Sequence, residues 1–524
     1  MNFMNAMKET LNQETKLTEN GAVGYRTTGK ELLDLNFAVA SLRSMTDDEV
    51  ARRFKKAFCE DKVLAMKWLF YARDVRQGLG ERRLFRVVLA DLVESNPEMV
   101  VPVINLIPEY GRYDDLWCLL DNSKSARVVY QIVDAQLLAD LKGMAAGEPI
   151  SLLAKWLPSI NASSAKTKAY GKKIARALRI SEKEYRKTLK ILRRYLDVVE
   201  RKMSNKEWSE INYETVPSRA NLVYNKAFLR NDEERRREYL GKLEKGEAKI
   251  NASTLFPHDI VHKYHGGGRV RLGAKDAAIE GLWKALPDTV KGCGNTIVVA
   301  DGSGSMTTTV DPKSSVTALD VANALAIYFA ERSSGQFKDK YITFSENPQF
   351  VDFSNCDSLH AKLQKAACYT EVANTNIEKV FDLILASAVN NKMSQDDLPA
   401  NILIISDMEF DACSVSGEPQ ARRSYWGTYY DWTSTNRPTQ TLFQSIALRY
   451  ARYGYKMPRL VFWNVASRTG TIPVKENDLG VALVSGFSVN IAKMVMSGKT
   501  DPFECLLETL NSERYAPVEA ALKS

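Results

Sequence analysis

Apolar residues recur at helical spacing through the first half of the chain. Residues 61–75 and 81–95 each carry an amphipathic pattern, and Gly78-Leu-Gly80 separates them. The second segment, for example, places Leu84, Val88 and Leu92 on one face. Short helices that follow one another in this way predict an α-helical, HEAT-like repeat domain over residues 1–290, although no exact sequence repeat is visible.

The pattern changes after Gly292-Cys-Gly294, where short apolar runs begin to alternate with helical segments. The expected strands are residues 296–300, 340–344, 400–405, 459–465 and 481–485, and the expected helices are residues 315–332, 376–387, 440–452 and 489–496. Continuous apolar strands separated by helices indicate a doubly wound, mostly parallel sheet covered on both faces. The predicted fold is therefore an α-helical domain followed by an α/β domain of Rossmann-like type over residues 292–524.

One helix in the first half has a clear start signal. Ser181 and Glu184 form a capping box, and the helix that follows has an apolar stripe through Tyr185, Leu189 and Leu192. The opposite face carries cations at helical spacing. This helix is expected to bury its stripe and present its cations to a partner or to water.

Positive charge is concentrated in the part of the chain that contains this helix. The chain has 524 residues and a net charge of +8, but residues 151–250 alone contain 25 basic and 13 acidic residues, whereas residues 301–524 contain 21 and 25. A concentrated positive patch favours a polyanion such as RNA, and a merely solvated basic face is the alternative. The candidate phosphate-binding residues are Lys166, Lys168, Lys172, Lys173, Arg176, Lys183, Lys187, Lys190 and Arg194.

The lack of recognisable targeting signals and the arrangement of the cysteines lead us to expect a cytoplasmic protein. No run of about 18 apolar residues is present, so we expect no membrane span. The first residues lack the pattern of a secretory signal, and the seven cysteines are scattered without a CxxC pair, which is typical of free thiols in a reducing compartment.

Oxygen-bearing side chains follow the expected strands. Asp301, Ser303 and Ser305 come directly after the first strand, Asp407 follows the third, and Thr375 precedes a helix. In doubly wound sheets, ligands bind beyond the carboxyl ends of the strands. These oxygens suit Mg²⁺ or a similar divalent cation, held partly through water, while ordinary turn formation by Asp, Ser and Gly is the alternative.

This constellation resembles the metal-ion-dependent adhesion site of von Willebrand factor A (vWA) domains, whose pattern is DxSxS, then Thr, then Asp. The resemblance implies that Asp301, Ser303, Ser305, Thr375 and Asp407 are the metal ligands. A basic helical domain before a vWA domain also resembles TROVE proteins, typified by the Ro autoantigen, and a bacterial and phage group related to them. The segments that carry this likeness are residues 71–86, 155–158, 213–219 and 256–261.

The resemblance implies an RNA-binding ribonucleoprotein component. Its helical domain would bind structured or misfolded RNA, and its vWA domain would dock a partner that offers a carboxylate to the metal. A metal-dependent protein-interaction scaffold without RNA is the alternative. We expect no enzyme, because the candidate site contains no His or Cys to act as base or nucleophile.

Two further features are less specific. His258, His262 and His265 have the spacing of one helix face, but no HExxH glutamate accompanies them, so zinc binding is disfavoured. Residues 413–439 form an insertion rich in Tyr, Trp and Arg, which suits base stacking or a protein partner, or else folds back on its own domain.

Overall fold

The computed structural model describes residues 15–17, 23–265, 272–290, 295–344, 348–369, 378–409, 420–424, 427–431, 442–467, 470, 472, 481–491 and 501–523. The chain forms two compact units. The sheet unit comprises Met1–Ser44, Pro257–Gly273 and Asp288–Leu507, and the helical unit comprises Met45–Phe256, Ala274–Pro287 and Glu508–Ser524. The expected domains, residues 1–290 and 292–524, divide the chain at one point. The compact units differ from them mainly in three segments, because residues 1–44 and 257–273 belong to the sheet unit and residues 508–524 belong to the helical unit.

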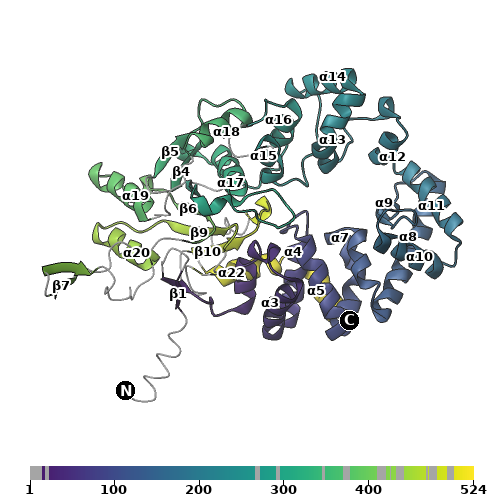
Figure 1. The fold of residues 1–524 in the computed structure, drawn as a ribbon, viewed down its shortest axis with the longest axis horizontal. Coiled ribbons are helices and arrows are strands. Elements are labelled where there is room, and N and C mark those ends of the chain that lie inside the picture. The colour runs from purple at the N-terminus through teal and green to yellow at the C-terminus, as the bar shows by residue number, and fades with distance from the viewer. Residues whose placement is uncertain are drawn as a thin grey trace, which may run out of the picture. The chain divides into compact units, whose positions relative to one another are not determined.

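The sheet unit is built on six strands in the order β10-β9-β6-β3-β4-β5 (Figure 1). All neighbouring pairs are parallel except β4 and β5, which are antiparallel. The strands are β3 (Thr296–Asp301), β4 (Lys340–Phe344), β5 (Gln349–Asp352), β6 (Asn401–Ser406), β9 (Arg459–Asn464) and β10 (Val481–Ser485). The expected α/β class is therefore confirmed.

Burial explains why the central strands could be recognised. Every residue of β3 and β10 is buried, and β6 and β9 are buried after their first residue. Such continuous apolar strands are stable only when helices cover both faces of the sheet. Among the described residues, the helices of this unit are α2 (Glu31–Phe37), α15 (Pro257–His265), α17 (Ala318–Arg332), α18 (Leu359–Ala367), α19 (Glu378–Asn390) and α20 (Leu442–Arg452), and α22 (Pro502–Leu510) begins in it.

The order of the strands reverses between β3 and β6. From β3 the chain adds β4 and β5 on one side, and then adds β6, β9 and β10 on the other. The carboxyl ends of β3 and β6 therefore lie at the point where the strand order reverses, which is where open α/β sheets bind ligands.

The segment before residue 45 belongs to this sheet unit. Asn464 Nδ2 donates a 2.8 Å hydrogen bond to the carbonyl of Phe37, and the Ala40 N–H donates a 3.0 Å bond to Ser485 Oγ. Both acceptors and donors are buried, so α2 is fixed against the β9–β10 side of the sheet. Contacts across more than 400 residues of sequence cannot be recognised from periodicity.

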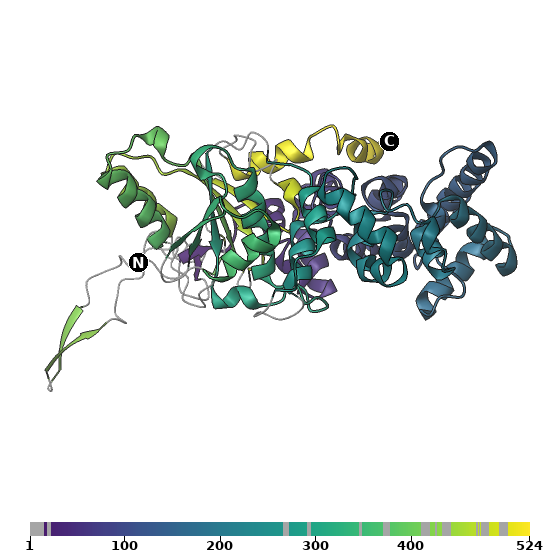
Figure 2. The same cartoon turned by 90° about the horizontal axis from the view of Figure 1, so that it is seen from above.

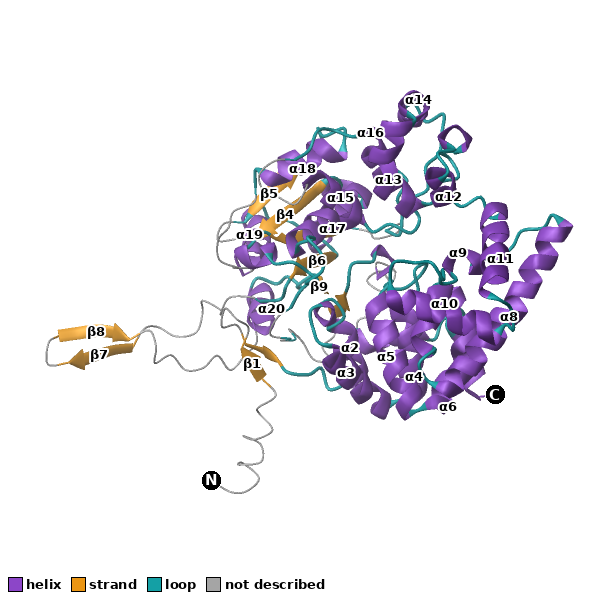
Figure 3. Ribbon diagram, turned by 45° about the vertical axis from the view of Figure 1, so that its right-hand side comes forward, coloured by secondary structure: helices purple, strands orange, loops and turns teal. Residues whose placement is uncertain are grey.

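The helical unit contains helices and no strand in its described residues (Figure 3). Residues 61–75 and 81–95 were expected to be helical, and α4 (Lys62–Arg73) and α5 (Arg82–Ser95) confirm this. The helices are α3 (Asp47–Glu60), α4 (Lys62–Arg73), α5 (Arg82–Ser95), α6 (Pro97–Val100), α7 (Ile107–Tyr110), α8 (Ser123–Ala146), α9 (Leu153–Trp156), α10 (Ala165–Ala177), α11 (Glu182–Tyr195), α12 (Val199–Ser204), α13 (Ser218–Asn231), α14 (Glu233–Glu244), α16 (Ala277–Lys284) and α23 (Ala516–Lys523).

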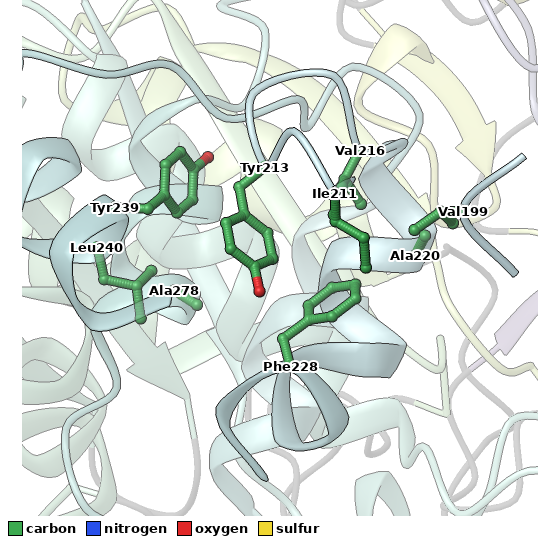
Figure 4. Close-up of a cluster of buried hydrophobic side chains, with 9 residues drawn as sticks. All are labelled: Val199, Ile211, Tyr213, Val216, Ala220, Phe228, Tyr239, Leu240 and Ala278. Carbon is green, nitrogen blue, oxygen red and sulfur yellow. The ribbon is translucent and has the colours of Figure 1, made fainter. Parts of the chain in front are cut away.

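A cluster of aromatic and aliphatic side chains holds α13, α14 and α16 together (Figure 4). Phe228 is fully buried and packs edge-on against Tyr213, with 5.3 Å between ring centroids. The buried Arg236 guanidinium lies 4.8 Å from the centre of the Tyr213 ring and donates to Asn225 Oδ1 at 2.9 Å. Cation–π contacts and a hydrogen bond thus compensate the burial of this charge.

The end of the chain returns to the first helices of the helical unit. Lys67 of α4, itself buried, pairs with Glu519 of α23 at 2.9 Å, and Arg514 pairs with the buried Asp74 at 2.8 Å.

The five cysteines in the described ranges are free thiols. Among those residues, no helix is long and apolar enough to cross a membrane.

Candidate functional site

Asp301 ends β3 and is only 1% exposed. Its Oδ1 accepts a 2.9 Å hydrogen bond from the backbone N–H of Ser303, so the carboxylate organises the turn that follows it. The hydroxyls of Ser303 and Ser305 are hydrogen-bonded to each other at 2.9 Å. Three of the predicted metal ligands are therefore gathered on one turn.

The end of β6 supplies the other side of this cluster. Ser406 Oγ donates a 2.7 Å hydrogen bond to Asp301 Oδ2. Asp407 follows as a buried carboxylate whose Oδ1 accepts from the Glu409 N–H at 3.2 Å. Met408, between Asp407 and Glu409, has φ +63°, a left-handed conformation that non-glycine residues seldom adopt. This turn follows the end of β6 directly, so Asp407 and Glu409 both lie close to the end of that strand.

The electrostatics of the cluster are unfavourable for two ionised carboxylates. Burial, followed by the negative charge of Asp407, raises the pKa of Asp301 to about 7, although hydrogen bonds from Ser406 and Ser303 act in the opposite direction. Burial and a neighbouring like charge thus both disfavour the ionised carboxylate, and a bound cation would relieve this strain on the charged form.

The donor set fits a hard divalent cation. Asp301, Ser303, Ser305 and Asp407 offer only oxygen atoms, which Mg²⁺ prefers. The fifth predicted ligand, Thr375, lies outside the described residues. Within the described ranges no group of three or more His, Cys, Asp or Glu side chains is arranged to hold a metal. The cluster has two carboxylates and two hydroxyls, so it is not a group of that kind. Its role as a metal site stays a prediction.

Sequence patterns missed the polar residues after a third strand. Asn464 ends β9, and its Oδ1 accepts a 2.9 Å hydrogen bond from the Ser467 N–H. Ser467 Oγ in turn donates to the fully buried Glu409 carboxylate at 3.4 Å. The signal was present as polar residues directly after an apolar strand, the same signal that singled out Asp301 and Asp407.

Two of the three histidines of α15 share one carboxylate partner. His262 and His265 both bond through Nδ1 to Asp320 of α17, and His262 Nε2 also lies 2.9 Å from Ser315 Oγ. Burial acts to raise the pKa of Asp320, but hydrogen bonds from His265 and the Thr317 N–H outweigh it and lower the value to about 2. His258 instead packs against Phe487. These contacts fix α15 to the start of α17.

The predicted RNA-binding residues all lie on the surface of the helical unit. The nine side chains are exposed on α10 and α11, which are in the blue part of the chain in Figure 2. We call this set the basic face: Lys166, Lys168, Lys172, Lys173, Arg176, Lys183, Lys187, Lys190 and Arg194. The capping box of Ser181 and Glu184 is formed, and α11 buries Tyr185, Leu189 and Leu192 as expected.

Six members of the basic face have no acidic partner among the residues that the structure describes. Lys166 and Lys173 lie within 4.0 Å of Asp121, and Lys172 lies 3.4 Å from Glu182. No carboxylate of the described ranges approaches the remaining six within 4.0 Å: Lys168, Arg176, Lys183, Lys187, Lys190 and Arg194. Their charge is therefore available to a partner.

Arg193 differs from its neighbours. Arg193 also belongs to α11, but its guanidinium turns inward and donates to the carbonyls of Ala154 and Leu157, each at 2.8 Å. It anchors the loop after α9 instead of extending the basic face.

The aromatic insertion at residues 413–439 is described only in part. A hairpin of β7 (Gln420–Ser424) and β8 (Gly427–Asp431) pairs antiparallel, and the rest of the insertion lies outside the described residues. Its expected role as a stacking or docking loop stays a prediction.

The family described as domain of unknown function DUF2828 matches residues 18–109 and 112–296, which is more than half of the chain. The protein belongs to this family. A second family, described as domain of unknown function DUF7788, matches residues 295–516 and thus begins with the first strand of the six-stranded sheet.

Two individual proteins are also similar. Uncharacterized protein L728 of Acanthamoeba polyphaga mimivirus is 27% identical over 543 residues, covering 96% of this chain and 88% of the relative. The crystal structure of the Deinococcus radiodurans RO (RSR) protein is 13% identical, covers 88% of this chain and 93% of that one, and has a TM-score of 0.33. A TM-score at that level supports no conclusion about this chain.

Proposed function

We propose that the protein binds RNA through the basic face of α10 and α11. The observation that carries the proposal is a set of six exposed cations on two adjacent helices, which no carboxylate of the described part of the chain approaches within 4.0 Å. Lys183, Lys187, Lys190 and Arg194 repeat at helical spacing, so they form one row along α11. A row of cations on a rigid helix contacts successive phosphates without reading sequence.

Structured or misfolded small RNA is the proposed partner class, as in the TROVE proteins that the sequence resembles. The successive packing of α3, α4 and α5 supports HEAT-like repeats as the scaffold that carries this face. We propose that the protein binds this RNA in the cytoplasm and that no membrane takes part.

A co-purification experiment tests the RNA role. The wild-type protein, a variant with Lys183, Lys187, Lys190 and Arg194 changed to Glu, and a control variant with Lys226, Arg230, Lys245 and Lys249 changed to Glu are purified at low salt. The control residues are exposed cations of the same unit outside α10 and α11. RNA should accompany the wild type and the control but not the first variant. Wild-type protein free of RNA, which also fails to shift structured RNA, would contradict the proposal.

We also propose that the sheet unit is a vWA-type domain that docks a protein partner through a divalent cation. The strand order, and the meeting of Asp301, Ser303, Ser305 and Asp407 at its switch point, favour this second role. When bound, Mg²⁺ would supply a positive centre that accepts a carboxylate from the partner. The cluster is assigned recognition and not catalysis.

Calorimetric titration with Mg²⁺ tests the metal site directly. Binding should be measurable in the wild type and lost in Asp301→Ala, with Asp311→Ala, an acidic residue in the loop before α17, as the control. Equal Mg²⁺ binding by the wild type and Asp301→Ala would show that the cluster is not the site. If Mg²⁺ binds but no interaction depends on Asp301, the metal has a structural role and the scaffold function fails.

A further inference from the structure

The helical unit contains a cavity of about 740 Å³. It lies among α3, α5, the 3₁₀ helix Tyr113–Leu119, the end of α9 with the loop that follows it, and the first two turns of α10. This volume falls within the usual range of small-ligand sites, about 300–1,000 Å³. All of its lining residues belong to one unit, so the cavity is defined without reference to the sheet unit.

Three aromatic side chains line the cavity, and contacts fix two of them. Trp117 Nε1 donates a 3.3 Å hydrogen bond to the carbonyl of Trp156, and the Tyr170 hydroxyl donates to Asp121 Oδ2 at 2.7 Å. Trp156 is partly exposed and has the Arg112 guanidinium 4.1 Å from its ring centre. Aromatic rings held in this way can stack a planar ligand with little loss of side-chain entropy.

The cavity and the basic face share one helix. Lys166 belongs to the basic face and lines the cavity, and its Nζ lies 5.5 Å from the centre of the Tyr170 ring. The remaining basic residues of α10 follow within three turns. A strand whose phosphates contact α10 would therefore pass beside the cavity.

The charges in the cavity select a base over a phosphate. Its lining carries an excess of negative charge, which would repel a phosphate: two cations, Arg86 and Lys166, against the carboxylates of Asp47, Asp48, Asp91 and Asp114. Asp91 pairs with Lys55 at 2.8 Å, and Asp114 pairs with Arg86 at 2.8 Å. Paired carboxylates keep lone pairs that accept hydrogen bonds from the amino groups of a nucleobase.

We propose that this cavity receives a nucleobase unstacked from single-stranded RNA, while the flanking phosphates lie on the basic face. The proposal rests on the RNA-binding function proposed above and adds to it a preference for single strands. Single-stranded RNA can splay its bases onto aromatic side chains, whereas paired bases in a duplex cannot leave the stack without an energetic cost.

Fluorescence anisotropy with three RNA probes tests the proposal. The probes are a single strand of about 12 nucleotides, the same strand with abasic positions that keep every phosphate, and its blunt duplex. The wild type should bind the intact strand about 5- to 150-fold more tightly than the abasic strand, as one stacked base would require. Equal affinity for the intact and abasic strands would overturn the proposal, and this arm needs no variant to fold.

Variants of Trp156 assign the effect to the cavity. Trp156→Leu should lose the preference for the intact strand, Trp156→Phe should retain most of it, and binding of the duplex should not change. Thermal unfolding of each variant verifies that it is folded. A Trp156→Leu protein that still prefers the intact strand would contradict the proposal.

The same measurements distinguish a failure of the RNA-binding function from a failure of the nucleobase cavity. If none of the RNA probes binds at low salt, the RNA function itself fails. If all of the probes bind, lose affinity on charge reversal of the basic face, and do not respond to abasic positions, only the cavity assignment fails.

Discussion

Ser406 Oγ donates a 2.7 Å hydrogen bond to Asp301 Oδ2, and this bond joins the ends of β6 and β3 across the switch point of the sheet. Both residues are buried. The bond holds the Asp301 carboxylate in place before any ligand is present, and it links the two strand ends that carry the proposed metal ligands.

Removal of this bond should destabilise the protein. Ser406→Ala leaves a buried carboxylate oxygen without its donor, so we expect a loss of about 1–3 kcal/mol in the free energy of unfolding. Urea unfolding measures the change. Ser387→Ala is the control, because this exposed hydroxyl bonds only its own helix and its removal should cost less than about 0.5 kcal/mol. Equal small losses in both variants would show that the bond is unimportant.

The raised pKa of Asp301 predicts a pH dependence of stability in the absence of metal. The pKa rises from an ordinary 3.8 to about 7 on folding, so the folded state binds this proton more tightly than the unfolded state. The resulting stability is fully present below about pH 4 and is lost as the pH rises through about 7.

Urea unfolding in a chelator between pH 5 and pH 8 tests this dependence. The wild type should lose stability relative to Asp301→Asn across that range, and Mg²⁺ should restore stability at pH 8 in the wild type alone. Parallel pH profiles for the two proteins would contradict the assigned pKa.

In the helical unit, a buried ion pair should matter far more than an exposed one. Arg73 and Asp115 are 2% and 0% exposed and pair at 2.7 Å. Asp115→Ala leaves the Arg73 charge buried without its carboxylate, so we expect a cost of about 3–5 kcal/mol. The control is Arg237→Ala, which breaks an exposed helical pair with Glu233 and should cost about 0.5 kcal/mol or less. Thermal and urea unfolding measure both variants, and similar costs would refute the distinction.

The α/β class and most strands of the sheet could be predicted because their residues are continuously apolar. The edge strand β5 could not. It is four residues long, Val351 is its single buried residue, and Phe350 is 52% exposed, so it has no apolar run. An antiparallel edge strand of this kind takes its structure from pairing with β4.

The candidate sites show the same division between local and distant information. The capping box and stripe of α11 are local signals, and the exposure of its cations followed from them. The inward turn of Arg193 depends on carbonyls of Ala154 and Leu157, and the bond from Ser406 to Asp301 joins residues 105 apart. Periodicity does not encode contacts that depend on tertiary packing, and neither the cavity at Trp156 nor the His262–Asp320 contact was predicted.

The salt dependence of RNA binding tests directly whether the basic face contacts phosphates. The affinity of the wild type for a structured RNA is measured over a range of salt concentrations beside the variant with Lys183, Lys187, Lys190 and Arg194 changed to Glu and the control with Lys226, Arg230, Lys245 and Lys249 changed to Glu. Each phosphate contact contributes about 0.7–0.9 to the slope of log K against log salt, so loss of four contacts should reduce the slope by about 3. We expect that reduction in the first variant and a slope close to that of the wild type in the control. Equal slopes in all three proteins would contradict this expectation.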